Sequence, residues 1–209
     1  MKQVVHVVDD DESFLRSMSR LLQAAGYDVR TYGSADDFFA RFDAETPGCV
    51  LTDLQMPRRS GLQLQEMVAK SANPLPVVFI TGRGDIPTSV LAMRGGAEDF
   101  LMKRSPKAAL LEAVARALER DADDRASRGR HRAARERLGT LSQREREVLA
   151  GVIRGELNKQ IARRLGLAER TVKFHRTAST RKLGVSSAAQ LAILVRDAGL
   201  TTEDLGGVK

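Results

Sequence analysis

In the first half of the chain, chemically reactive side chains recur where short apolar runs stop. In chain order they are Asp9 to Asp11, Asp53, Thr81 and Lys103. Such runs suit buried strands, and the carboxyl ends of parallel strands form the edge of a sheet where ligands bind. Carboxylates, a hydroxyl and an ammonium group gathered at that edge suit phosphoryl transfer, which depends on positioning and charge neutralisation.

Asp53 is the residue that we expect to accept the phosphoryl group. It follows the apolar run Cys49–Thr52, and Pro57 and Gly61 mark a loop and then the start of a helix. An aspartate in such a place more often caps a helix or forms a turn. The prediction therefore depends on the other residues at the same edge.

The acidic residues at this edge also predict a cation site. Carboxylates that converge do not all stay ionised without a cation, because like charges destabilise each other. Asp9 to Asp11 and Asp53 offer only oxygen ligands, without a Cys or His cluster, which suits a hard ion such as Mg²⁺. Lys103 and Thr81 would contact the phosphoryl oxygens. Alone, each residue has a simpler interpretation, as a helix cap, a turn residue or a surface lysine.

A parallel sheet must position these residues, and residues 1–118 alternate strand-like with helix-like runs. Five strand–helix units with short connections predict an α/β doubly wound five-stranded parallel sheet. The expected strands are residues 4–8, 29–32, 50–52, 77–80 and 99–102. The expected helices are residues 12–25, 34–42, 61–70, 86–94 and 106–118.

The composition is that of an ordinary globular protein, with 42% hydrophobic residues and a single cysteine, Cys49. One cysteine excludes an internal disulfide, and its apolar neighbours indicate packing rather than reactivity. His6 breaks the first apolar run, residues 4–8, and Asp9 to Asp11 follow it, which excludes a secretory signal. No segment approaches a membrane span. We expect a soluble cytoplasmic protein without a membrane partner.

Positive charge is concentrated toward the end of the chain. Residues 1–118 carry 14 Lys and Arg against 15 Asp and Glu, whereas residues 141–209 carry 13 against 7. A nucleic-acid partner for the second part is one interpretation, and a solvated basic surface is the other.

Residues 119–140 form a charged segment with almost no large apolar side chains, which we interpret as a linker. Opposite charges four residues apart, such as Asp121 and Arg125, favour a helix that continues the preceding one. Gly129 weakens that helix by about 1 kcal/mol relative to alanine, so a weak point is expected near residues 127–129. The alternative is an arm that binds the DNA backbone through Arg128, Arg130, Arg132, Arg135 and Arg137.

Residues 141–209 show only helical patterns, which predict an all-α domain of four helices. Capping boxes begin the first helix at Ser142 and the fourth at Ser187, and Asn158 can cap the second. A turn at Gly166 joins the second helix to a third at residues 169–183, as in a helix-turn-helix.

The third of these helices is the candidate reader of the DNA major groove. Val172 and His175 share one side of it and are expected to pack inward. The residues expected to face DNA lie on the other side; they are Lys173, Phe174, Arg176 and Thr177. A helical domain that docks onto another protein is the alternative.

Five motifs of the first domain together indicate a protein family. They are Val7-Val8-Asp9-Asp10, Thr52-Asp53-Leu54-Gln55-Met56-Pro57, Ser60-Gly61, Ile80-Thr81-Gly82 and Asp99-Phe100-Leu101-Met102-Lys103. On these residues, segment 1–118 resembles the CheY-like receiver domain of two-component response regulators, and within that family the FixJ-like branch.

The resemblance implies that a sensor histidine kinase phosphorylates Asp53, with Lys103 beside it. It implies Mg²⁺ ligands at Asp9, Asp10, Asp53 and the backbone carbonyl of Gln55. It also implies that Thr81 and Phe100 form a switch pair, in which the hydroxyl turns toward the phosphate and the ring swings inward. Asp11 lies beyond the acidic pair and is expected to cap a helix.

One position departs from the family pattern, in which a proline follows the lysine, often after a cis peptide bond. Here Arg104 follows Lys103, and the proline is Pro106. A cis bond before a residue other than proline costs about 3 kcal/mol. We therefore expect a trans or a strained bond, and a loop that aims Lys103 less tightly.

The second domain carries motifs of its own. They are Leu141-Ser142-Gln143-Arg144-Glu145-Arg146-Glu147-Val148-Leu149, Asn158-Lys159-Gln160-Ile161-Ala162, Thr171-Val172-Lys173-Phe174-His175 and Lys182-Leu183. On these residues, segment 141–209 resembles the LuxR-type helix-turn-helix domain of FixJ- and NarL-like regulators. The resemblance implies a dimer surface on the fourth helix. It implies base contacts from Lys173, Phe174 and Thr177, and phosphate contacts from Lys159, Thr171 and Lys182.

Two further residues depart from the family pattern, one inside the third helix and one just before it. Ser179 replaces an aliphatic residue, and its hydroxyl is expected to bond back to the carbonyl of His175. Ala168 replaces the usual serine cap. Both changes predict a less stable reading helix.

The sequence thus predicts a phosphorylation-switched transcription regulator rather than an enzyme. Phosphorylation of Asp53 is expected to drive dimerisation through residues 86–102 and binding to double-stranded promoter DNA, with RNA polymerase as a further candidate partner. One alternative is a regulator that binds DNA without phosphorylation. The other is a phosphohydrolase with Asp53 as nucleophile, which Gln55 argues against because the haloacid-dehalogenase type carries a second aspartate there.

Overall fold

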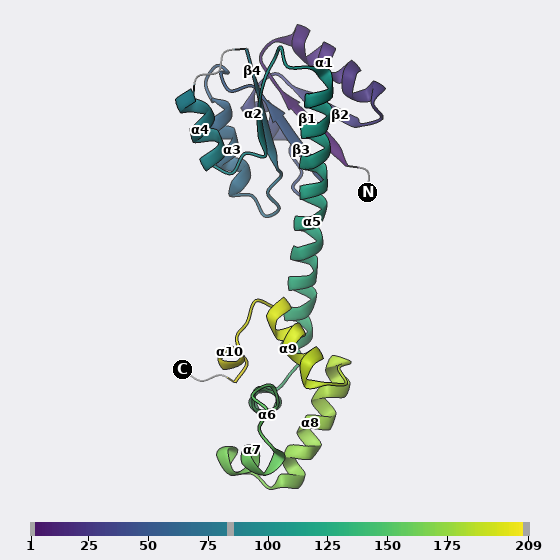
Figure 1. Ribbon diagram of the computed structural model, residues 1–209, viewed down its shortest axis with the longest axis vertical. Helices are drawn as coiled ribbons and strands as arrows, with labels where there is room; N and C mark the ends of the chain where they lie inside the picture. Colours follow the sequence, from purple (N-terminus) through teal and green to yellow (C-terminus); the bar gives the residue numbers. More distant parts are fainter. Residues whose placement is uncertain (1–2, 83–85, 207–209) are drawn as a thin grey trace. The chain divides into compact units, whose positions relative to one another are not determined.

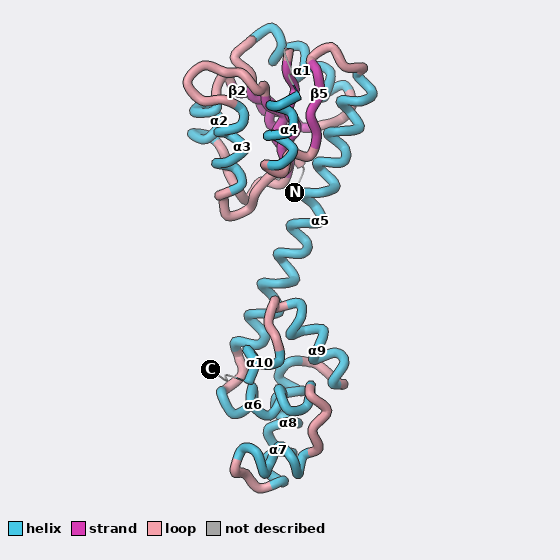
Figure 2. Tube along the Cα trace, turned by 60° about the vertical axis from the view of Figure 1, so that its left-hand side comes forward, coloured by secondary structure: helices cyan, strands magenta, loops and turns pink. Residues whose placement is uncertain are grey.

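The computed structural model describes residues 3–82 and 86–206, and the chain divides into two compact units, Met1–Arg125 and Ala126–Lys209. Among the described residues, strands occur in the first unit alone, and helices and loops build the second (Figure 2). The division falls inside the segment that the sequence sets apart as a linker. None of the helices in residues 3–82 and 86–206 has the length and apolar character needed to cross a membrane.

The first unit is built on a five-stranded parallel sheet flanked by helices (Figure 1). The strand order in this sheet is β2-β1-β3-β4-β5. The strands are β1 (Val4–Val8), β2 (Asp28–Tyr32), β3 (Gly48–Thr52), β4 (Val77–Thr81) and β5 (Asp99–Met102). Every residue of β1, β3 and β4 is buried, as expected for strands that are covered on both faces. The predicted doubly wound sheet is confirmed.

Helices cover both faces of this sheet. They are α1 (Glu12–Ala24), α2 (Ala35–Arg41), α3 (Gly61–Ala69), α4 (Ile86–Arg94) and the first part of α5 (Lys107–Gly139). α1 and α5 bury residues such as Leu22 and Val114 against one face, while α2 and α3 bury Phe38 and Leu64 against the other. Because all strands are parallel, their carboxyl ends lie along one edge, which we call the carboxyl edge.

The helix α5 has 33 residues and belongs to both units. The predicted continuation of the helix into residues 119–140 is confirmed as far as Gly139, and the helix does not break at residues 127–129. In the first unit, the buried Asp121 carboxylate accepts a hydrogen bond from the Gly48 N–H at 2.8 Å and pairs with Arg125 at 2.9 Å. The Arg125 guanidinium also donates to the backbone carbonyls of Ala44, Glu45 and Thr46.

The last part of α5 is anchored in the second unit. Arg135 donates to the carbonyl of Ala198 at 2.8 Å, and Arg137 donates to that of Leu183. These contacts occupy two of the five arginines considered for a DNA-binding arm. The residues of α5 buried in the apolar core of this unit are Ala134 and Leu138.

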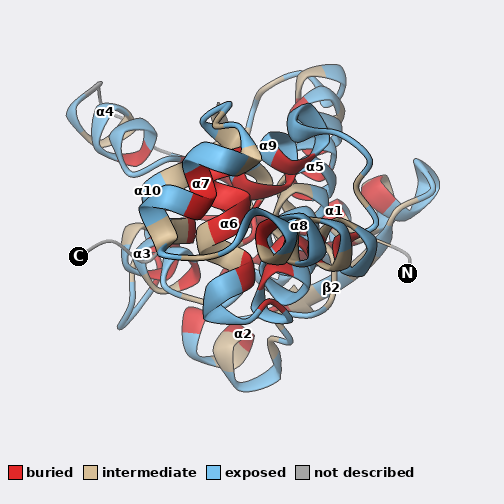
Figure 3. Ribbon diagram, turned by 90° about the horizontal axis from the view of Figure 1, so that it is seen from below, coloured by how far each residue is buried: buried red, intermediate tan, exposed pale blue. Residues whose placement is uncertain are grey.

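Five further helices complete the second unit. They are α6 (Gln143–Ile153), α7 (Asn158–Leu165), α8 (Glu169–Leu183), α9 (Ala188–Asp197) and α10 (Thr202–Gly206). Buried residues gather on α6, where Val148 and Leu149 are fully enclosed (Figure 3). The short helix α10 was not predicted, and it adds Leu205 to the same core.

Capping hydrogen bonds fix the starts of two of these helices. The capping box of α6 is confirmed, because Ser142 and Glu145 each bond the other's backbone N–H. Ser187 caps α9 as predicted. The box predicted there was wrong, however, since the Gln190 side chain accepts from the Ser186 N–H rather than from that of Ser187.

Candidate functional site

The predicted residues of the first unit meet at the carboxyl edge of the sheet. The residues that follow or end β1, β3, β4 and β5 are Asp9, Asp53, Thr81 and Lys103. Asp9, Asp10 and Asp53 each place a carboxylate oxygen within 4.8 Å of the other two. Asp53 thus meets the neighbouring residues Asp9 and Asp10, from which it lies far away in the sequence, and the three form one cluster, which we call the acidic cluster.

The ammonium group of Lys103 bridges two of these carboxylates. Its Nζ lies 2.6 Å from Oδ2 of Asp9 and 3.1 Å from Oδ2 of Asp53. Asp9 is fully buried and Asp53 nearly so. Ion-pair hydrogen bonds are strong in such a water-poor setting, so Lys103 offsets the repulsion between the two carboxylates.

The surroundings shift the pKa of both Asp9 and Lys103. Burial raises the pKa of Asp9 above its ordinary value of 3.8, although hydrogen bonds from Lys103 and from the Asp11 N–H oppose the shift. Burial by itself lowers the pKa of Lys103, but hydrogen bonds to Asp9 and Asp53 outweigh it, so this pKa is raised. Lys103 is therefore positively charged at neutral pH. A second positive charge nearby would further stabilise the ionised form of Asp9.

The backbone around Asp53 fixes the direction of its side chain. Oδ1 accepts hydrogen bonds from the N–H groups of Leu54 at 2.6 Å and Gln55 at 3.4 Å, which leaves Oδ2 toward Lys103. The following loop packs so closely that a Cβ at Gly61 would lie 2.2 Å from the Asp53 carbonyl oxygen. Glycine is therefore required where α3 begins.

The two residues of the predicted switch pair lie on neighbouring strands. Thr81 is buried at the end of β4, and its carbonyl accepts a hydrogen bond from the Lys103 N–H at 2.8 Å. Phe100 is half-buried on β5, and its ring centroid lies 6.1 Å from that of Phe79, its partner in the strand register. The pairing of β4 with β5 thus connects the switch residues to Lys103.

The loop after β5 closes without a proline next to Lys103. Every peptide bond among the described residues is trans, including the one between Lys103 and Arg104. Ser105 closes the turn, because its N–H donates to the Met102 carbonyl at 2.8 Å and its Oγ accepts from the Met102 N–H at 3.1 Å. Lys103 still reaches both carboxylates, so Arg104 does not turn it away.

One contact of Lys103 was not predicted from the sequence. Its Nζ lies 4.3 Å from the centroid of the Phe14 ring, as in a cation–π interaction. The helical pattern assigns Phe14 only to the apolar face of α1. The available signal was its place in the first turn after the acidic run.

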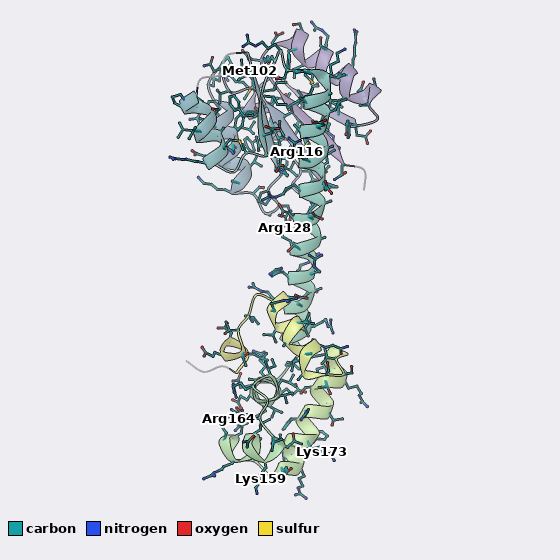
Figure 4. All side chains as sticks on the ribbon, in the orientation of Figure 1. Met102, Arg116, Arg128, Lys159, Arg164 and Lys173 are labelled. Carbon is teal, nitrogen blue, oxygen red and sulfur yellow. The ribbon has the colours of Figure 1, made fainter. Side chains whose placement is uncertain are left out.

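The second unit exposes side chains of α7 and α8 that suit contact with nucleic acid. Lys173, Phe174 and Thr177 are exposed on α8, Phe174 by 70%, while Val172 is fully buried as predicted. Lys159 on α7 and Lys173 on α8 extend from the same end of this unit (Figure 4). Lysines suit phosphates, and an exposed ring suits the apolar edges of bases.

A side-chain hydrogen bond connects α8 to the start of α7. Nη1 of Arg176 donates to Oδ1 of Asn158 at 3.2 Å. Asn158 lies in the first turn of α7, so the prediction that it caps this helix was wrong. The preceding N–H, that of Leu157, donates instead to the Gln160 side chain at 2.7 Å.

Lys182, for which a phosphate contact was predicted, is engaged inside its own unit. Its Nζ lies 3.0 Å from Oε2 of Glu145 and 3.2 Å from the carbonyl oxygen of Thr140. The N–H of Ser142 is the main cause that lowers the pKa of Glu145, and Lys182 adds to it. This ion pair ties the last turn of α8 to the first turn of α6.

The departures noted in the reading helix are visible in α8. The Ser179 hydroxyl is buried and donates to the His175 carbonyl at 2.5 Å, which confirms the predicted bond. Ala168 occupies the N-cap and offers no side-chain hydrogen bond. His175 and Thr171 are both half-buried, so His175 packs only partly inward.

Comparison with known proteins gives the family of both units. The family model of the response regulator receiver domain matches residues 5–115, and that of the bacterial regulatory proteins of the luxR family matches residues 139–195. The chain is 38% identical to the response regulator protein TodT of Pseudomonas putida, over 90% of this chain and 83% of that protein. It is 39% identical to the transcriptional regulatory protein FixJ of Azorhizobium caulinodans, over 96% of this chain and 95% of that protein.

Solved structures give the same family. The response regulator StyR matches with a TM-score of 0.84 and 43% identity, over 94% of this chain and 99% of that one. Full-length FixJ from B. japonicum matches with a TM-score of 0.58 and 32% identity, over 95% of this chain and 98% of that one. The chain therefore belongs to the two-component response regulators, and it combines a receiver domain with a LuxR-type DNA-binding domain.

Proposed function

We propose that Asp53 accepts a phosphoryl group from a sensor histidine kinase and that this event switches DNA binding. The acidic cluster carries the proposal, since its oxygens lie within 4.8 Å of one another and Lys103 joins Asp9 to Asp53. In the transfer, an Asp53 oxygen forms a bond to phosphorus while the bond from phosphorus to the kinase imidazole breaks. Lys103 and Thr81 then contact the phosphoryl oxygens.

The acidic cluster fits a magnesium site made by Asp9, Asp10, Asp53 and the Gln55 carbonyl. Its side-chain donors are all oxygens, which this ion prefers, and Lys103 pairs with two of the three carboxylates, those of Asp9 and Asp53. The raised pKa of the buried Asp9 means that a cation would stabilise its ionised form. When bound, Mg²⁺ supplies further positive charge for the phosphoryl oxygens.

For dimerisation we propose the surface of α4 and β5, within residues 86–102. Three apolar side chains of α4 are exposed there, Val90 by 42%, Leu91 by 57% and Met93 by 48%. A group of exposed apolar side chains on one helix favours burial against a second copy of the chain. Thr81 and Phe100 would transmit the phosphorylated state to this surface, because β4 and β5 flank α4 in the sequence.

The resulting dimer would bind double-stranded promoter DNA, with RNA polymerase as the partner through which transcription changes. We assign the linker role to residues 119–140. The exposed Lys173 and Phe174 support base contact by α8. The proposed DNA contacts are Lys159, Thr171, Lys173, Phe174, Arg176, Thr177 and Lys182.

Molar mass in solution tests the switch. In light scattering with Mg²⁺ and beryllofluoride, a mimic of the phosphoryl group, the full chain is expected to dimerise and Asp53→Asn is expected to stay monomeric. Leu91→Asp should bind the mimic and remain a monomer, which separates the acceptor site from the dimer surface. A wild-type monomer with the mimic bound would contradict the proposal. Equal DNA affinity with and without the mimic would favour a regulator that acts independently of phosphorylation.

A further inference from the structure

We propose that Phe14 is a positioning residue, whose ring holds the Lys103 ammonium group against the acidic cluster. The inference rests on the proposed function of Asp53, because Lys103 matters for phosphorylation only if Asp53 accepts the phosphoryl group. It adds to that function an aromatic residue from α1, outside the four strand ends that supply the other groups.

The geometry places Lys103 between a ring and two carboxylates. Its Nζ lies 4.3 Å from the Phe14 ring centroid, inside the roughly 6 Å range over which a ring face attracts a cation. The same atom lies 2.6 Å from Asp9 Oδ2 and 3.1 Å from Asp53 Oδ2. The ring therefore covers a side of the ammonium group that the carboxylates leave open, and it disfavours rotamers that point away from the cluster.

Phe14 is itself held in place by the residues of the acidic run. Its N–H donates to Oδ1 of Asp11, the N-cap of α1, at 3.2 Å. The Asp11 N–H in turn donates to Oδ1 of Asp9 at 2.9 Å, and the other oxygen of Asp9 pairs with Lys103. The ring is half-buried and packs against the apolar core under α1. A closed circuit of contacts thus runs from Asp9 through Asp11 and Phe14 to Lys103.

The loop after Lys103 gives the Phe14 contact a specific role in this chain. A proline does not follow Lys103, and the loop is held instead by Ser105, through two hydrogen bonds to Met102. Those bonds fix the backbone but do not direct the long Lys103 side chain. Four rotatable bonds separate its ammonium from the backbone, and the Phe14 ring restricts them through direct contact.

The inference is tested by the rate at which acetyl phosphate phosphorylates Asp53 in the full chain. In this reaction the phosphoryl group is transferred to the Asp53 carboxylate and acetate is released. Phe14→Leu is expected to slow this rate about five-fold, because an apolar side chain without a π face does not attract the ammonium. Phe14→Tyr keeps the ring and is expected to restore the rate. Phe39→Leu is the matched control, since Phe39 is also half-buried but packs against the opposite face of the sheet.

Two further measurements separate positioning from general stability. In a Lys103→Met background, Phe14→Leu should cause no further loss of rate, because its effect acts through the ammonium. NMR spectra recorded without phosphodonor report the same contact. The chemical shifts of the Lys103 side-chain protons next to Nζ should be displaced by the ring current of residue 14 in wild type and in Phe14→Tyr, and not in Phe14→Leu.

The outcomes distinguish this inference from the proposed function. If Asp53 is phosphorylated and Phe14→Leu reacts at the wild-type rate, the positioning role is overturned while the acceptor role stands. An equal loss in Phe39→Leu also overturns it. If wild-type Asp53 is not phosphorylated, the proposed function fails, and the NMR displacement alone decides whether Phe14 holds Lys103.

Discussion

At the residue scale, His6 shows how burial decides the charge of a group. It is fully buried in β1, and its Nδ1 lies 2.9 Å from the Tyr32 hydroxyl. The rings of Tyr32, Phe38 and Phe42 surround it. Burial, with a smaller effect from the charge of Arg30, lowers the pKa of His6 from 6.5 to about 4. His6 is therefore a neutral core residue at pH 7.

This shift predicts a loss of receiver stability on acidification. Between pH 6.5 and about 4 the unfolded chain binds a proton at His6 that the folded chain excludes, so the free energy of unfolding falls as pH decreases. The loss attributable to His6 is expected to approach about 3 kcal/mol at the lower end of that window. In His6→Gln, which does not titrate, the dependence on pH should be shallower.

Urea unfolding followed by tyrosine fluorescence measures this in the full chain. The chain has no tryptophan and two tyrosines, and both Tyr27 and Tyr32 lie in the first unit. The carboxylates titrate equally in wild type and in His6→Gln. The difference between the two slopes of unfolding free energy against pH therefore reports on His6. Parallel curves for wild type and His6→Gln would show that His6 does not couple folding to pH.

At the element scale, the helix α8 begins without a cap. Ala168 has the extended backbone of an N-cap, with φ −73° and ψ 146°, but its side chain has no oxygen to accept a hydrogen bond. The Ala168 side chain therefore gives the first N–H groups of α8 no acceptor, as serine or aspartate would, and the Thr171 N–H donates instead to the Ala168 carbonyl at 2.9 Å. Later in the same helix, the Ser179 hydroxyl bonds back to His175.

Ala168→Ser is expected to stabilise the first turn of α8 by about 1 kcal/mol, because the serine hydroxyl accepts a backbone N–H. Amide hydrogen exchange of residues 170–172 should slow about five-fold in the full chain, as such a free energy requires. Ala168→Val lacks the oxygen and serves as the control. Equal exchange in the serine and valine variants would mean that this helix start does not need a cap.

The helix α5 shows how one element can depend on two different cores. Its charged middle section has little apolar surface, and specific contacts hold it instead. Asp121 and Arg125 fix it to the receiver domain, and Arg135 and Arg137 fix it to the DNA-binding domain. A segment that reads as a solvated linker is therefore structured on both sides of the division between the units.

At the scale of the whole molecule, charge separates the two functions. The acidic and basic residues of segment 1–118 nearly balance, whereas segment 141–209 has 13 Lys and Arg against 7 Asp and Glu. Neutralisation of DNA phosphates by such a domain releases counterions, so its affinity for DNA falls as salt increases.

Lys159→Met is expected to weaken DNA binding and to reduce the slope of log affinity against log salt by about one per bound chain. Fluorescence anisotropy with a duplex of mixed sequence measures this slope, because phosphate contacts do not depend on base sequence. Lys70→Met removes an exposed lysine of the receiver domain and is the matched control. An unchanged slope in Lys159→Met would show that Lys159 does not contact a DNA phosphate.

The sequence by itself determined the type of both domains and the order of their elements as far as α9. The alternation of apolar runs with helical patterns predicted all five strands, because local periodicity records which side of each element faces the core. The acidic cluster and Lys103 were predicted for a related reason: residues at the carboxyl ends of parallel strands share an edge whatever the loops between them do. Local hydrogen bonds, such as those of Ser142 and Ser179, were also predictable.

Only the tertiary structure decided which distant groups meet. Phe14 follows its helical pattern equally well with or without Lys103 above its ring. Lys182 reads as a free positive charge until Glu145 is found 3.0 Å away, and Asn158 reads as a cap until Arg176 is found beside it. These contacts form because packed elements bring together side chains that are far apart in the sequence. Local periodicity and capping preferences depend only on neighbouring residues, so they do not predict such contacts.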